Sequence, residues 1–154
     1  MIRTTLAIIA VLQISASCSL YLLFRPDTLL IFHWVDHLGM AAWVDLARSQ
    51  YAQMEVELPT IFVFSIPFAL LVSGSMTLHH VIWWKTRSWT SRFWFWCVPL
   101  SAIGSELLQI HQYIPGTFDQ IDLAAICMTA TLAAGLTRAH SFIETSKERP
   151  FIEN

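Results

Sequence analysis

Residues 59–84 read PTIFVFSIPFALLVSGSMTLHHVIWW, a run without aspartate, glutamate, lysine or arginine. A helix of about 20 apolar residues is long enough to cross the hydrocarbon core of a bilayer. Three further apolar runs, at residues 5–24, 93–114 and 121–140, have similar lengths. The sequence therefore predicts an all-α membrane protein in which residues 1–154 form one domain, a bundle of four transmembrane helices.

The composition supports this class. Hydrophobic residues make up 55% of the chain and charged residues 13%, whereas soluble domains carry about 25% charged residues. A net charge of -2 without a basic stripe excludes nucleic acid as a partner. Cys18, Cys97 and Cys127 lie in apolar runs without C-x-x-C spacing, which indicates small buried side chains rather than disulfides or metal ligands. Hydrophobicity continues through Phe24, past the possible signal-peptide cleavage region at Ser15-Ala16-Ser17, and predicts an uncleaved helix.

Charge asymmetry between the loops predicts the orientation. Lysine and arginine gather before the first run, between the second and third, and after the fourth: Arg3, Lys85, Arg87, Arg92, Arg138, Lys147 and Arg149. The positive-inside rule places these segments, and both termini, in the cytoplasm. The acidic loop at residues 25–58 and the turn at 115–120 then lie outside the cell membrane, and membrane lipids are the expected partners of the apolar surface.

The outer loop contains a helical pattern of its own. Residues 29–46 have apolar positions at helical spacing, which predicts an interfacial amphipathic helix between the first two spans. His33 and His37 stand one turn apart in it, a spacing compatible with a metal, although no third ligand follows from the sequence and surface histidines are commoner. His79 and His80 would suit haem only with an opposing histidine at the same depth. We therefore expect no cofactor.

Polar residues form a stripe on the third span. At 100° per residue, an arc of about 140° contains six of them: Ser101, Ser105, Glu106, Gln109, Gln112 and Tyr113. Such a stripe faces the bundle interior, because lipid offers no hydrogen-bond partner. An ionised carboxylate at the bilayer centre costs roughly 2.5 to 3.5 kcal/mol, which favours a functional role for Glu106. The amides and hydroxyls are equally well explained as hydrogen bonds that join helices.

Similar stripes on the first two spans predict a shared polar cavity. One contains Gln13, Ser17 and Tyr21 and leads to Arg25; the other contains Ser65, Ser73, Thr77 and His80. We expect Glu106 to lie about 12 Å below the outer end of its helix, at 1.5 Å per residue. Arg25 is its nearest cationic partner if the first and third spans are neighbours.

Two aspartates flank the start of the last span. Asp119 occupies the predicted N-cap position and Asp122 the first turn, beside the positive end of the helix dipole. Together with Glu106 and Gln109 they would surround the tight turn at residues 115–116 and form an acidic pocket that opens outward. Capping explains one aspartate well, and it does not exclude binding.

The order Glu106-x-x-Gln109, then Pro115-Gly116, then Asp119-x-x-Asp122 before a helix of small residues is similar to the VanZ-like family. This family contains small multi-pass membrane proteins named for a glycopeptide (teicoplanin) resistance protein, and its biochemical activity is not established. The resemblance covers roughly the last third of the chain. The family commonly has arginine where Thr117 stands. It often has asparagine one turn after the second aspartate, where this chain has Ile126.

The resemblance implies a membrane protein of the cell envelope. Its outward-facing pocket would bind a polar lipid, a cell-wall precursor or a cation, with Glu106 as the buried acid, Gln109 orienting the ligand and Asp119 and Asp122 at the entrance. The alternative is a non-catalytic accessory subunit of a larger membrane complex that docks through its last, small-residue helix. The chain has no H-E-x-x-H, P-loop or dinucleotide-binding motif, so an enzyme ranks behind both.

Overall fold

The computed structural model describes residues 2–25, 27, 30–54, 58–86, 88–114 and 118–147, with side chains described as far as residue 139 except at residue 30. This part of the chain is all-helical, which confirms the predicted fold class. The helices are α1 (Ile2–Phe24), α2 (Leu30–His37), α3 (Ala41–Ala52), α4 (Thr60–Ile82), α5 (Trp89–Ile110) and α6 (Gln120–Lys147). Four of them, α1, α4, α5 and residues Gln120–Ala139 of α6, are long and apolar enough to cross a membrane. The chain is thus a multi-pass membrane protein.

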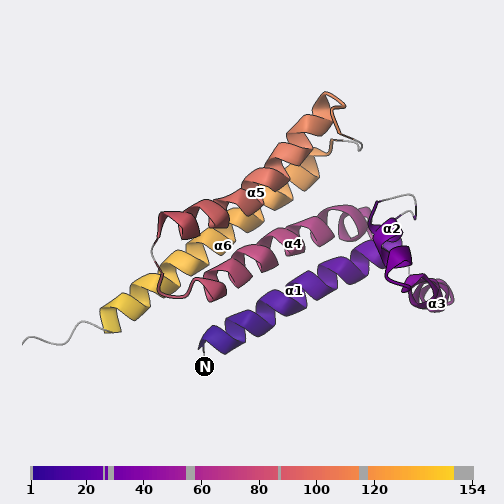
Figure 1. Cartoon of the computed structure of the whole chain (residues 1–154). Coiled ribbons are helices and arrows are strands. Elements are labelled where there is room, and N and C mark those ends of the chain that lie inside the picture. The colour runs from indigo at the N-terminus through magenta and orange to yellow at the C-terminus, as the bar shows by residue number, and fades with distance from the viewer. Residues whose placement is uncertain are drawn as a thin grey trace, which may run out of the picture.

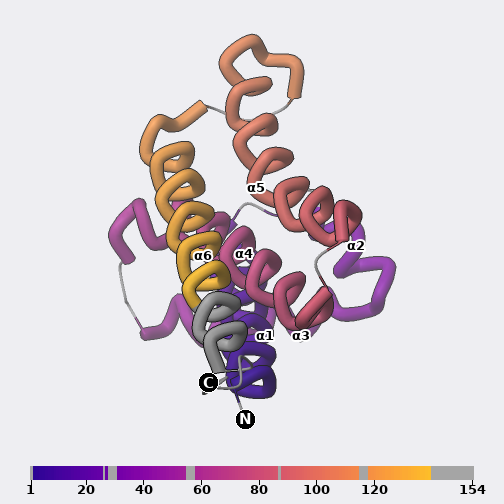
Figure 2. Tube along the Cα trace, turned by 90° about the vertical axis from the view of Figure 1, so that its left-hand side faces the viewer, coloured from indigo at the N-terminus to yellow at the C-terminus, as the bar shows by residue number. Residues whose placement is uncertain are grey.

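Helix α4 is the centre of the bundle. It packs along α1 on one side and along α6 on another, while α5 lies against α4 and α6 (Figures 1 and 2). The start of α1 and the α4–α5 turn lie at one end of the bundle, and α2 and α3 lie at the other (Figure 1). The pairing of Arg25 with Glu106 was expected only if the first and third spans are neighbours, and in the described residues α1 packs mainly against α4.

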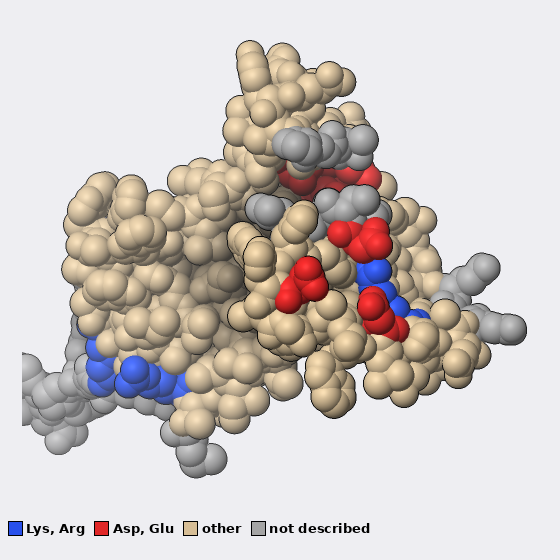
Figure 3. Space-filling view, turned by 45° about the vertical axis from the view of Figure 1, so that its right-hand side comes forward, with Lys and Arg blue, Asp and Glu red and all other residues tan. Residues whose placement is uncertain are grey.

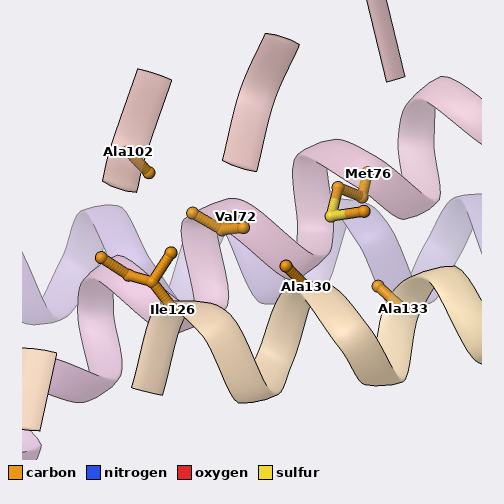
Figure 4. Close-up of a cluster of buried hydrophobic side chains, with 6 residues drawn as sticks. All are labelled: Val72, Met76, Ala102, Ile126, Ala130 and Ala133. Atoms are coloured by element: carbon orange, nitrogen blue, oxygen red, sulfur yellow. The ribbon is translucent and has the colours of Figure 1, made fainter. Parts of the chain in front are cut away.

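The core joins the last three spanning helices. Its buried side chains are Val72 and Met76 of α4, Ala102 of α5, and Ile126, Ala130 and Ala133 of α6 (Figure 4). Lipid tails are as apolar as these side chains, so close packing between helices, rather than escape from water, is what stabilises the bundle. Ala130 and Ala133 allow that close approach, which supports a packing role for these two small residues of α6.

Helix α5 begins and ends four residues earlier than predicted. Its first turn is capped by Ser88, whose hydroxyl accepts a hydrogen bond from the Ser91 N–H at 3.1 Å. At the other end Gln112 adopts a left-handed conformation with φ 56°. The Gln112 and Tyr113 N–H groups bond to the carbonyls of Gln109 and Leu108, each at 3.1 Å, in a Schellman motif. Glu106 therefore lies one turn, about 6 Å, from the end of its helix rather than 12 Å.

For the other spanning helices, the observed first residue lies closer to the predicted one than it does for α5. Helix α1 begins at Ile2, and α4 covers Thr60–Ile82. Helix α6 continues to Lys147, beyond the apolar run on which the prediction rested.

The single helix predicted for the outer loop is wrong. Gly39, with φ 69°, separates α2 from α3. The Gly39 N–H bonds to the Asp36 carbonyl at 2.8 Å and the Met40 N–H to the Val35 carbonyl at 2.9 Å, a second Schellman motif. Glycine adopts the left-handed conformation without steric cost, so α2 ends here and the chain changes direction.

Candidate functional site

A cavity of about 380 Å³ lies where the end of α1 meets the first turns of α4 and α6 and the last turns of α5. Its volume falls within the range of small-molecule sites, roughly 300 to 1,000 Å³. All five ligand-binding candidates predicted from the sequence line it: Arg25, Glu106, Gln109, Asp119 and Asp122. The remaining lining residues are Tyr21, Thr60, Ile61, Phe64, Ser65, Phe68, Ser105 and Ile121. The Pro115–Gly116 turn of the predicted pocket lies outside the described residues.

Glu106 is the most deeply buried acid of this cavity. Its side chain is 4% exposed, and the carboxylate oxygen Oε2 has no hydrogen-bond partner among the described residues. The Asp119 backbone hydrogen-bonds this carboxylate, the charges of Asp122 and Asp119 repel it, and the charge of Arg25 attracts it. A buried acceptor without a partner is costly. Glu106 thus keeps an unused acceptor at the cavity.

The two aspartates combine structural bonds with a place in the cavity wall. Asp119 caps α6, because its Oδ1 accepts the Ile121 N–H at 2.8 Å, as predicted. Asp122 accepts a hydrogen bond from the Ser65 hydroxyl, which joins α6 to α4. Both partners are uncharged donors, so the negative charge of the two carboxylates is not neutralised by them.

Arg25 is the first residue after α1, and its side chain lines the cavity. Its Nη2 donates to the Phe64 carbonyl at 3.3 Å, and its guanidinium carbon lies 4.5 Å from the Phe64 ring centroid and 5.4 Å from that of Tyr21. Its Nε is buried without a partner among the described residues. Within that part of the chain Arg25 also makes no ion pair with the cavity acids, so the pairing with Glu106 that was expected if the first and third spans were neighbours is not formed.

Arg48 of α3 supports this arrangement, and the sequence reasoning missed it. Its Nε donates to the Leu22 carbonyl at 2.7 Å and its Nη2 to the Arg25 carbonyl at 2.5 Å, while its guanidinium carbon lies 4.5 Å from the Phe32 ring centroid. The last carbonyls of a helix lack partners within it, and a cation there is also favoured by the helix dipole. Arg48 therefore fixes the end of α1, from which Arg25 enters the cavity.

Several polar side chains of the predicted stripes serve packing instead. The buried Ser17 hydroxyl donates to the Pro67 carbonyl at 2.6 Å, joining α1 to α4. The Ser101 and Ser105 hydroxyls bond within α5, to the carbonyls of Val98 and Ala102. Interhelical and local hydrogen bonding thus explains these hydroxyls, whereas Glu106 and Gln109 remain at the cavity.

The histidines show no shared site in the described part of the chain. His33 and His37 are exposed on α2. In the described residues no group of three or more histidine, cysteine or acidic side chains is arranged to hold a metal ion. His79 Nε2 lies 2.9 Å from the Ser91 carbonyl oxygen and its ring stacks on Trp83, so this side chain joins α4 to the start of α5.

The site presents groups that can bind a polar ligand. Three carboxylates and an amide can accept hydrogen bonds or attract a cation, one guanidinium can bind an anion, and Phe64 and Phe68 provide apolar walls. No family model, curated protein or solved structure matches the chain.

Proposed function

We propose that the protein is a VanZ-like membrane protein of the cell envelope that binds the polar part of a ligand in this cavity. The observation that carries the proposal is the unpartnered oxygen of the buried Glu106 carboxylate. The Asp119 backbone already hydrogen-bonds the Glu106 carboxylate, but the Oε2 atom has no described partner. A buried acceptor without a partner is costly, and a bound ligand would supply the missing donor to this oxygen.

The shape of the cavity favours a ligand larger than a bare ion. Its volume of about 380 Å³ accommodates a polar headgroup, and its wall combines the acids with the apolar side chains of Ile61, Phe64, Phe68 and Ile121. Amphiphiles such as a lipid or a lipid-linked cell-wall precursor have this mixed character. Glu106 would accept from the ligand, Gln109 would orient it, and Asp119 and Asp122 would line the approach.

The cavity would open on the outer side of the cell membrane, with both termini in the cytoplasm. Lysine and arginine gather near one end of the molecule, and the acids lie with a few arginines near the other (Figure 3). By the positive-inside rule the basic end is cytoplasmic. The exposed residues Asp45 of α3 and Thr86 of the α4–α5 turn lie at opposite ends and can report the orientation.

We expect a membrane-impermeant maleimide to label Asp45→Cys in intact cells and Thr86→Cys only after the membrane is permeabilised. The native Cys18, Cys97 and Cys127 are replaced by serine in both variants. Labelling is read from the mass of the purified protein. The opposite pattern would place the cavity on the cytoplasmic side.

Glu106→Gln is expected to reduce co-purified ligand about tenfold. The amide has the shape of the acid, but hydrogen bonds to an ionised acceptor are roughly twice as strong, and about 1.4 kcal/mol corresponds to a factor of ten. Ligand is measured by mass spectrometry of the protein purified in mild detergent. The matched control is Asp45→Asn, which removes an exposed acid outside the cavity. Unchanged occupancy in Glu106→Gln and in Asp122→Asn would make the cavity a purely structural feature.

The same purification tests an accessory-subunit function. One observation favours it: Ala124 and Gly135 are exposed on α6, and a Cβ added at Gly135 would meet nothing within 4 Å. Small residues of this kind let another membrane helix approach closely. Stoichiometric recovery of further membrane subunits, lost in Gly135→Leu, would establish that function.

A further inference from the structure

We infer that the cavity selects a ligand carrying both a primary ammonium group and a phosphate, the chemistry of an aminophospholipid headgroup. This inference rests on the proposed function and specifies the ligand class of the same site. It follows from three features of the described residues: an excess of acids, an Arg25 guanidinium that makes no ion pair with a described acid, and apolar walls.

The acids of the cavity outnumber its cations. Glu106, Asp119 and Asp122 all line the cavity, and Arg25 is the one cation among the described lining residues. Asp119 and Asp122 are bonded to a backbone N–H and to a hydroxyl, neither of which carries a charge. Uncompensated charges are expensive in a low-dielectric environment. A cationic group in the cavity would offset them.

The positive partner is better explained as an ammonium group than as a metal ion. Hard cations require several oxygen ligands that converge on one point. The described residues contain no group of three or more acidic, histidine or cysteine side chains arranged in this way. A primary ammonium has three N–H donors. It can therefore use the free Oε2 of Glu106 and still face Asp122 or Asp119.

Arg25 supplies the complementary site for an anion. Its guanidinium makes no ion pair with a described acid, its Nε is buried without a described partner, and it is held against the Phe64 ring. The guanidinium fork matches the oxygens of a phosphate. A ligand with its ammonium group at Glu106 and its phosphate at Arg25 would satisfy both charges at once.

The apolar walls of the cavity favour a lipid as the ligand over a soluble headgroup compound. Ile61, Phe64, Phe68 and Ile121 line the cavity beside the charged groups, and water-soluble aminophosphates have nothing to place against them. Glu106 is one turn from the end of α5, and Arg25 follows directly on α1. Both positions suit the headgroup level of a bilayer rather than its centre.

The test compares three phospholipids with identical acyl chains on delipidated wild-type protein, using native mass spectrometry. We expect phosphatidylethanolamine to bind about tenfold more tightly than phosphatidylcholine or phosphatidylglycerol. The choline headgroup is cationic but has no N–H donor, and the glycerol headgroup has no cation. Soluble phosphoethanolamine is added as a competitor. If millimolar phosphoethanolamine does not displace the bound phospholipid, the ligand is a lipid. If phosphoethanolamine displaces the phospholipid at an equal concentration, the headgroup alone is the ligand.

Two variants test which residue binds the ammonium group and which binds the phosphate. Glu106→Gln should reduce the preference for phosphatidylethanolamine over phosphatidylglycerol to about twofold or less. Arg25→Gln should weaken all three lipids about tenfold and keep their ratio, because each contains the phosphate. The controls are Asp45→Asn and Arg3→Gln, which replace exposed residues outside the cavity. They should change neither the lipid affinity nor the preference among lipids.

Failure of this inference differs from failure of the proposed function. Equal binding of the three lipids to the wild-type protein, while Glu106→Gln still loses its co-purified ligand, overturns the ammonium and phosphate assignment and leaves the cavity a binding site. If Glu106→Gln changes neither the co-purified ligand nor the lipid preference, both are overturned.

Discussion

Gly74→Leu is expected to destabilise the protein by about 3 kcal/mol, the upper end of the usual cost of overpacking a filled site. Gly74 is buried where α4 meets α1. A Cβ at this position would lie 2.8 Å from Ile14 Cγ1, 3.1 Å from the Ala10 carbonyl oxygen and 3.1 Å from Gln13 Cβ. The Ile14 side chain can rotate away, but the Ala10 carbonyl belongs to the backbone of α1. The two helices must therefore separate to admit a leucine.

The midpoint of thermal unfolding in mild detergent measures this effect. Gly135→Leu is the matched control, because it makes the same substitution within a spanning helix at a position where an added Cβ meets nothing within 4 Å. Gly104→Leu on α5 is a second control of the same kind. If Gly74→Leu unfolds at the same temperature as both controls, α1 does not pack on α4 as described.

Arg48→Ala is expected to weaken ligand retention by about 2 kcal/mol, although Arg48 does not line the cavity. Its guanidinium donates to two carbonyls at the end of α1, and hydrogen bonds from charged groups are worth about 1.5 to 3 kcal/mol each. The side chain is half-buried, so solvent reduces the combined value. Without it the end of α1 loses its anchor, and Arg25 loses its fixed position at the cavity.

The measurement is the amount of co-purified ligand, compared with the thermal midpoint of the same preparation. Arg48→Lys should retain little more ligand than Arg48→Ala, because an ammonium lacks the guanidinium fork that reaches both carbonyls. Gln50→Ala, an exposed neighbour on α3, is the control. A lower midpoint with full ligand retention would show that Arg48 stabilises α3 without positioning Arg25.

The four spans and the candidate site were predictable for physical reasons. A run of apolar residues long enough to cross a bilayer has few alternatives, and polar residues within it have to face other helices. The spacing of Glu106, Gln109, Asp119 and Asp122 around a short turn brings them together whatever the remaining packing. Arg25 reaches the same cavity because it directly follows the first span.

Other features depended on information that the sequence expresses weakly. The end of α5 is set by Gln112 in a left-handed conformation that glycine or asparagine more often adopts, so no signal marked it. Gly39, in contrast, was such a signal, and reading residues 29–46 as one helix overlooked it. The position of α1 was not predictable from loop length, because a long loop permits several neighbours. The contact depends on the small Gly74 and the Ser17 hydroxyl.

The length of α6 has a consequence for whatever follows it. This helix has 28 residues, which at 1.5 Å per residue gives about 42 Å, whereas the hydrocarbon core is about 30 Å thick. If α6 enters the core near its first turn and stands upright, its last turns extend about 12 Å past the opposite boundary. They would form a stiff stalk. A reporter joined directly after Lys147 would then be carried clear of the lipid headgroups instead of lying against them.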